Sequence, residues 1–167
     1  MAQDEATFGR ISTLRRCWAP PGERPVAPRQ VERDDIHAYT AVAPSLGRMT
    51  TLLLPDANAA MMSPFLAQVG TDFADYLVVM HVDRAGWHRA ADLAVPENIR
   101  LLFQPARSPE LNPVEHIWDH LRETAVPNRA FATLDALMDD RCVGFRALAA
   151  DPDRLRSMTA FPHLRSP

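Results

Sequence analysis

Three acidic residues stand where a carboxylate can do chemistry. Asp4 closes a short N-terminal strand fragment, Asp83 follows an apolar run, and Glu115 opens a helix after a proline. The ends of strands are rigid, so carboxylates held there can converge without a flexible loop. Carboxylate oxygens are hard ligands for Mg²⁺ or Mn²⁺, and two such ions about 3.5–4 Å apart can activate the attacking oxygen and stabilise the leaving one in phosphodiester chemistry. Spacing alone does not establish such a site, because Asp and Glu also occupy turns and caps.

The segment around Glu115, SPELNPVEHIW, also has a purely structural explanation. Asn112 is a good N-cap, and Pro113 suits the first helical position, where no N–H is needed. Glu115 then falls at the third position, from which it can reach back to the cap as in a capping box. A carboxylate bound to a metal cannot also reach fully back to the cap, so the sequence leaves both roles open.

The elements that must position these residues are strands alternating with helices. We expect strands at 1–4, 36–43, 49–54, 76–82 and 99–103, and helices at 58–69, 113–125 and 134–149. The run YLVVMHV at 76–82 is typical of a strand buried on both faces. This order predicts an α/β fold, a mixed sheet with helices on its faces. We expect one domain over residues 1–150 and a weakly structured C-terminal tail over 151–167.

The composition fits one compact domain and limits the cellular setting. The chain has 167 residues, of which 47% are hydrophobic. There are two cysteines without zinc-ligand spacing, no apolar run long enough to span a bilayer and no signal-peptide pattern at the N-terminus, so we expect a cytoplasmic location. The net charge of −3 argues weakly against nucleic acid as a partner, yet all basic residues are arginine. Arginine binds phosphate bidentately, but a lysine-free chain also follows from genome composition.

Four stretches carry a resemblance to a known family. They are DEATFGR from Asp4, CWAPPGERP at 17–25, VDRAGWHRA at 82–90 and QPARSPELNPVEHIWDHLRE at 104–123. Together they resemble the motifs of the catalytic domain of DDE transposases, in the bacterial insertion-sequence branch related to mariner elements. The resemblance runs from about Asp4 to Glu123, and its last stretch is the most specific.

The resemblance implies a ribonuclease-H-like fold in which Asp4, Asp83 and Glu115 are the catalytic residues and bind two Mg²⁺ or Mn²⁺ ions. The implied activity is metal-dependent cleavage of a DNA strand at the element end, followed by attack of the freed 3′-OH on target DNA. The implied partners are DNA, both element ends and target, and a second copy in a homodimeric active complex. Family members also carry upstream helix-turn-helix segments that bind the terminal repeats, here expected in the same protein or in a second chain.

Three further residues are expected to contact DNA: Arg84, His88 and Arg107. Arg84 replaces the family's usual asparagine, and Arg107 stands where a tyrosine is common, so each indicates either a phosphate contact or decay of the site. His88 either helps to position DNA or water or is a structural histidine. Because the chain starts almost at Asp4, we expect an N-terminally truncated fragment that lacks most of the first strand. The competing hypothesis is a catalytically silent remnant, at most a folded DNA-associated or dimerising fragment.

Other residues allow less specific interpretations. His81, Asp83 and His88 have the types and spacing of a zinc hydrolase site, but no further histidine cluster supports one. Glu5 should point to the face opposite Asp4, in a surface or helix-pairing role. The three tryptophans are expected in core or lid packing, with stacking on an unpaired base as the alternative: Trp18, Trp87 and Trp118.

Overall fold

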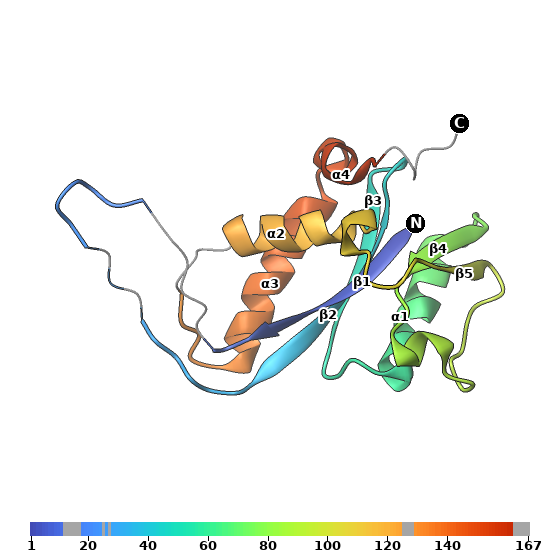
Figure 1. Cartoon of the computed structure of the whole chain (residues 1–167), viewed down its shortest axis with the longest axis horizontal. Helices are drawn as coiled ribbons and strands as arrows, with labels where there is room; N and C mark the ends of the chain where they lie inside the picture. Colours follow the sequence, from blue (N-terminus) through green and yellow to red (C-terminus); the bar gives the residue numbers. More distant parts are fainter. Residues whose placement is uncertain (12–17, 25, 27, 125–128, 162–167) are drawn as a thin grey trace.

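A computed structural model describes residues 1–11, 18–24, 26, 28–124 and 129–161. Its centre is one five-stranded sheet with the strand order β3-β2-β1-β4-β5 (Figure 1). The strands are β1 (Ala2–Gly9), β2 (Asp35–Ala43), β3 (Arg48–Leu54), β4 (Val78–Val82) and β5 (Ile99–Phe103). β1, β2 and β3 pair antiparallel, whereas β4 runs parallel to both β1 and β5. The predicted mixed sheet is therefore confirmed.

Helices cover both faces of the sheet and enclose two separate cores. Helix α1 (Ala59–Asp72) packs on one face, where Phe65 and Leu66 meet residues of β2, β4 and β5. On the other face lie α2 (Val114–Thr124), α3 (Leu134–Ala149) and α4 (Pro152–Thr159). Trp118 of α2 lies there in edge-to-face contact with Phe8 and Phe145. Two short 3₁₀ helices, Gly86–Arg89 and Pro109–Leu111, follow β4 and β5.

The first strand is longer than the sequence predicts. The strand expected at 1–4 continues to Gly9 and pairs with β2 along all eight residues. Ala6 and Phe8 alternate with more exposed residues and enter the core beneath α2, which is what keeps the chain extended. Asp4 thus lies inside a central strand and not at the end of one.

The burial of β4 also differs from the prediction. Val78, Met80 and Val82 are buried against α1, but Val79 on the opposite face is 51% exposed. On the neighbouring β5, Leu102 is 56% exposed. The helices of that face contact β1, β2 and β3 and leave this half of the sheet open.

The prediction of a weakly structured tail is wrong for residues 152–159, which form α4. Asp151 caps this helix by accepting a hydrogen bond from the Arg154 N–H at 3.0 Å, and Leu155 is fully buried against the core. The Arg156 guanidinium donates to the Leu46 carbonyl in the turn between β2 and β3. Gly47 in that turn has φ +60 and lies so close to the Pro152 backbone that a side chain there would collide with it. Close packing onto this turn orders the helix.

The described residues 18–24 of the connection between β1 and β2 lie away from the sheet (Figure 1). Its described part contains a turn, in which the Glu23 N–H donates to the Pro20 carbonyl at 3.1 Å and Gly22 has φ +87. Trp18 is fully exposed there, so the prediction of packing for this residue is wrong. Cys17 and Pro25, the first and last residues of the sequence stretch at 17–25, lie outside the described residues.

Within the described residues, no helix has the length and apolar character needed to cross a membrane.

Candidate active site

One open cavity of about 390 Å³ brings the three predicted carboxylates together. Asp4 comes from the middle of β1, Asp83 from the residue after β4, and Glu115 from the first turn of α2. The rest of the lining comes mainly from the two loops after β4 and β5: Arg84, Ala85, Gln104, Pro105, Ala106, Arg107, Ser108, Pro109 and Asn112. Residues far apart in the sequence therefore share one concave surface.

Asp4 has an unfavourable environment for a charged carboxylate. The pKa of Asp4 is raised from 3.8 to about 7, mainly by burial and also by the charges of Glu115 and Glu5, against the opposing effect of a hydrogen bond from Trp118. In that bond the Trp118 indole N–H donates to Oδ2 of Asp4 at 2.9 Å. A nearby positive charge would favour the ionised form of such a carboxyl group.

The start of α2 is fastened to β1 beside Asp4. Asn112 is buried, and its side-chain amide donates to the Gln3 carbonyl at 3.0 Å while its Oδ1 accepts from the Val114 N–H at 3.2 Å. Glu115 is the second residue of α2, and among the described residues no hydrogen bond joins its carboxylate to the cap. The capping-box explanation therefore does not account for Glu115. The contact of Asn112 with Gln3 places the start of α2, and with it Glu115, near Asp4.

Trp118 contributes to the site in a way that the sequence interpretation missed. It is buried in the core, as predicted, but it also holds the Asp4 carboxylate. Glu115 and Trp118 are three residues apart, a spacing that puts two side chains on the same side of a helix. That spacing was the available signal for the contact.

Asp83 is held from behind by a buried histidine. The Ala85 N–H donates to Oδ1 of Asp83 at 2.8 Å, and Nδ1 of His88 lies 2.9 Å from the same oxygen. On the other side of the ring, Nε2 of His88 lies 3.0 Å from Oε1 of Glu5. The Trp87 indole N–H also points at that Glu5 oxygen, at 3.3 Å. Glu5 thus points away from Asp4, as predicted, but its side chain is only 9% exposed and has a buried partner in place of the expected surface role.

The His88 side chain is fully buried, which favours the structural alternative over a direct contact between the ring and DNA. Burial alone would lower the pKa of His88, but the hydrogen bond to Glu5 and the charges of Glu5 and Asp83 raise it above its usual value. Both ring nitrogens face carboxylates, so neither is available to a zinc ion, and the zinc-hydrolase interpretation loses this ligand.

The two arginines expected to contact DNA lie at the cavity. The Arg84 Nε–H donates to the Gln104 carbonyl at 2.9 Å and so ties the loop after β4 to the end of β5. Arg107 is exposed and has φ 58, a left-handed backbone conformation that is uncommon for a residue with a side chain. Both arginines belong to the lining of the cavity.

The carboxylate oxygens of the cavity suit a hard cation, but in this structure they do not surround one ion position. Within the described residues, no three His, Cys, Asp or Glu side chains are near enough to hold one metal ion. Asp4, Asp83 and Glu115 nevertheless supply the oxygen ligands that Mg²⁺ and Mn²⁺ prefer. The raised pKa of Asp4 indicates negative charge that lacks compensation, which is the electrostatic condition that a cation relieves.

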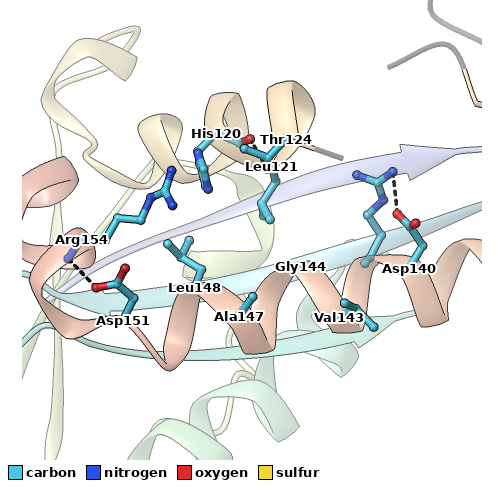
Figure 2. A pocket seen from close by; sticks show the side chains of 11 residues that line it. His120, Leu121, Thr124, Asp140, Val143, Gly144, Ala147, Leu148, Asp151 and Arg154 are labelled. Atoms are coloured by element: carbon cyan, nitrogen blue, oxygen red, sulfur yellow. Dashed lines mark hydrogen bonds and ion pairs between the residues drawn. The ribbon is translucent and has the colours of Figure 1, made fainter. Parts of the chain in front are cut away.

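A second cavity, of about 340 Å³, lies between α2, α3 and α4 and offers no comparable cluster (Figure 2). Its carboxylates already have partners: Asp140 contacts Arg129 at 2.6 Å and Arg141 at 3.2 Å, and Asp151 caps α4. Burial and the charge of Arg154 lower the pKa of His120 at its mouth. We therefore place the chemistry at the first cavity.

Comparisons with known proteins show the family of the chain. Residues 1–138 match the family model described as DDE superfamily endonuclease. The protein y4pE/y4sA of Sinorhizobium fredii (strain NBRC 101917 / NGR234), itself described as uncharacterized, is 37% identical over 123 residues, which cover 73% of this chain and 91% of that protein.

Solved structures of Mos1 transposase share the fold. The mariner paired end complex with Mn has a TM-score of 0.65 at 17% identity and covers 95% of this chain and 53% of its own. The pre-cleavage Mos1 transpososome has a TM-score of 0.63 at 16% identity, with 95% and 54% covered. The predicted ribonuclease-H-like fold is thereby confirmed, and the chain spans about half the length of these solved chains.

Proposed function

Because the chain belongs to the DDE superfamily endonucleases, we propose that it carries out metal-dependent cleavage and strand transfer of DNA in the transposition of an insertion sequence. By family and fold it is a DDE transposase-like catalytic domain. The observation that carries the proposal is the convergence of Asp4, Asp83 and Glu115, from three different elements, on one cavity.

Each carboxylate has a role that its contacts support. Oδ1 of Asp83 accepts a hydrogen bond from the Ala85 N–H and lies 2.9 Å from Nδ1 of His88, which also donates to the Asp83 main-chain carbonyl at 3.3 Å, so Oδ2 is the oxygen that a cation would meet. Asp4 is oriented by Trp118, and Glu115 by the anchored start of α2. Two Mg²⁺ or Mn²⁺ ions bound by these three residues would activate the attacking oxygen and stabilise the leaving one. Arg84 and Arg107 would bind the DNA phosphates beside the scissile bond.

The DNA partner is proposed from the same site and from the solved relatives. A Mos1 structure with a left transposon end is among the structures that share this fold. For this chain we propose element ends and target DNA as substrates, with a homodimer as the active complex. Its net charge of −3 predicts weak binding to DNA by itself, so a helix-turn-helix segment, in the same protein or a second chain, would supply the sequence-specific contacts.

Titration of the chain with Mn²⁺, followed by electron paramagnetic resonance, tests the proposal. We expect saturable binding that weakens at least about tenfold in Asp83→Asn and in Glu115→Gln, because each change removes a charged ligand. The matched control is Asp119→Asn, an exposed carboxylate on the same helix as Glu115, and it should bind Mn²⁺ as the unchanged chain does.

Strand cleavage is the second measurement. With a helix-turn-helix segment supplied, we expect Mn²⁺-dependent nicking at an element end, which Asp83→Asn should abolish. The competing candidate is a catalytically silent remnant. Absence of Mn²⁺ binding that depends on Asp83 and Glu115 would decide for that remnant.

A further inference from the structure

Three side chains follow one another behind the cavity, and of these only Asp83 belongs to the cavity lining. Oδ1 of Asp83, the His88 ring and Oε1 of Glu5 follow one another with contacts of 2.9 and 3.0 Å. The His88 side chain is completely buried and that of Glu5 is 9% exposed, whereas that of Asp83 is 42% exposed. This row of side chains therefore leads from the buried Glu5 to Asp83, the more exposed of the two carboxylates.

We infer that Glu5 and His88 are positioning residues that fix the orientation of the Asp83 carboxylate for cation binding, an inference that rests on the proposed function of Asp83. A carboxylate group turns easily about its last single bond, and a turned group presents a different oxygen to the cavity. The Ala85 N–H donates to Oδ1, and Nδ1 of His88 lies 2.9 Å from the same oxygen while it donates to the Asp83 main-chain carbonyl at 3.3 Å, so that Oδ2 is left for the ligand. Partners of this kind behind a metal-binding side chain are typically worth 10–100-fold in affinity.

Glu5 contacts the His88 ring, and it affects Asp83 only through that ring. An imidazole held at one nitrogen alone can swing, but His88 is held at Nε2 by Glu5 while Nδ1 faces Asp83. Glu5 is in turn held by the Trp87 indole. The neighbouring residues Asp4 and Glu5 therefore serve the same cavity from opposite faces of β1: one lines it, and the other supports a second carboxylate of the lining.

Two matched substitutions separate positioning from general structural support. In His88→Asn the amide nitrogen stands near the place of Nδ1 and can still donate to Asp83, whereas in His88→Gln it stands near the place of Nε2 and can reach only Glu5. Each variant keeps one of the two partners and is uncharged. We expect His88→Asn to bind Mn²⁺ within about threefold of the unchanged chain and His88→Gln to bind it at least about tenfold more weakly.

Glu5 has its own pair of variants. Glu5→Gln keeps an oxygen that accepts from the ring and should retain Mn²⁺ affinity, whereas Glu5→Leu should weaken binding about tenfold or more. The stability control is Asn98→Ala, which removes side-chain hydrogen bonds to the Gly70 and Phe73 carbonyls at the opposite end of β5. It should lower the melting temperature without changing Mn²⁺ affinity.

All titrations are made with the full chain, at a temperature at which each variant is folded. Equal affinities in His88→Asn and His88→Gln, or an equal loss in Asn98→Ala, would overturn the positioning role. Asp83→Asn serves as the reference in the same series. If it binds Mn²⁺ like the unchanged chain, the proposed function of Asp83 fails; if it loses binding while His88→Gln does not, only the positioning role fails.

Discussion

Asp4 and Glu5 are neighbours in the sequence, yet they lie in opposite electrostatic situations. Asp4 faces α2 and shares a cavity with two other carboxylates, and burial raises its pKa to about 7. Glu5 faces the other side of β1, where the His88 ring and the Trp87 indole both point at its carboxylate. The alternation of a strand thus separates a carboxylate that lacks compensation from one that is paired. Of these two neighbours, Asp4 is the one with an electrostatic reason to bind a cation.

The largest expected effect comes from breaking the paired side. Glu5→Leu leaves the His88 ring buried without its partner, and removing one member of a buried pair costs about 3–5 kcal/mol. We expect the free energy of unfolding, measured with urea in the absence of metal, to fall by that amount. The opposite substitution, His88→Leu, should destabilise the chain to a similar extent. A loss of less than about 1 kcal/mol in either variant would show that the pair is not closed in solution.

The unpaired side should respond in the opposite direction. The folded-state pKa of Asp4, about 7, exceeds the unfolded value of 3.8, so between these pH values the folded chain holds a proton that the unfolded chain releases. The stability of the metal-free chain should therefore fall as the pH rises from about 4 to about 7, by at most about 4 kcal/mol. Asp4→Asn removes this charge, and we expect it to stabilise the metal-free chain at pH 8 by about 2–4 kcal/mol.

Addition of Mn²⁺ at pH 8 tests whether Asp4 binds the ion. It should stabilise the unchanged chain and have a much smaller effect on Asp4→Asn, which lacks one ligand. If Asp4→Asn is less stable than the unchanged chain at pH 8 without metal, the assignment of Asp4 as an uncompensated carboxylate is wrong.

Two tryptophan donors provide a finer test. Trp118→Phe keeps much of the ring packing but removes the 2.9 Å hydrogen bond to Asp4. A hydrogen bond to a charged group is worth about 1.5–3 kcal/mol, and we expect a loss of that size above pH 7. The pKa of Asp4 should rise further, since this bond lowers it in the unchanged chain. Titration of Asp4 followed by NMR of its carboxyl carbon measures the shift, and an unchanged pKa would refute the contact.

Trp87→Phe is the smallest of the expected changes. Its indole contact with Glu5 is long, at 3.3 Å, and His88 still holds the same oxygen. We expect a loss of about 0.5–1 kcal/mol in the free energy of unfolding, measured with urea. A loss as large as that of Trp118→Phe would mean that the two sides of β1 depend equally on their tryptophans.

The sequence predicted the sheet and the three carboxylates better than it predicted their neighbours. Strands and helices follow from apolar periodicity, as for α1, which was expected at 58–69 and spans Ala59–Asp72. The segment around Asn112 placed Glu115 in the first turn of a helix, as α2 has it, because Asn-Pro restricts where the helix begins. These features depend on residues close together in the chain.

The missed features depend on residues far apart. The Glu5–His88 contact joins positions 83 residues apart, and no local pattern specifies that pairing. Helix α4 was missed because its order comes from packing on the turn between β2 and β3, where Gly47 gives it room. Val79 was expected to be buried because an apolar run does not tell which half of a sheet the helices will cover.

The central place of β1 has a consequence for the nascent chain. Strands β2 and β3 follow β1 along the chain and can complete a hairpin sheet as soon as Leu54 leaves the ribosome. The other edge of β1 must wait for β4, which ends at Val82, and for about a few seconds at a synthesis rate of roughly 5–20 residues per second that edge is open. An open strand edge is a template for pairing with other chains. Substitutions that slow the docking of β4 should therefore lower the soluble yield of newly made protein before they alter the folded state.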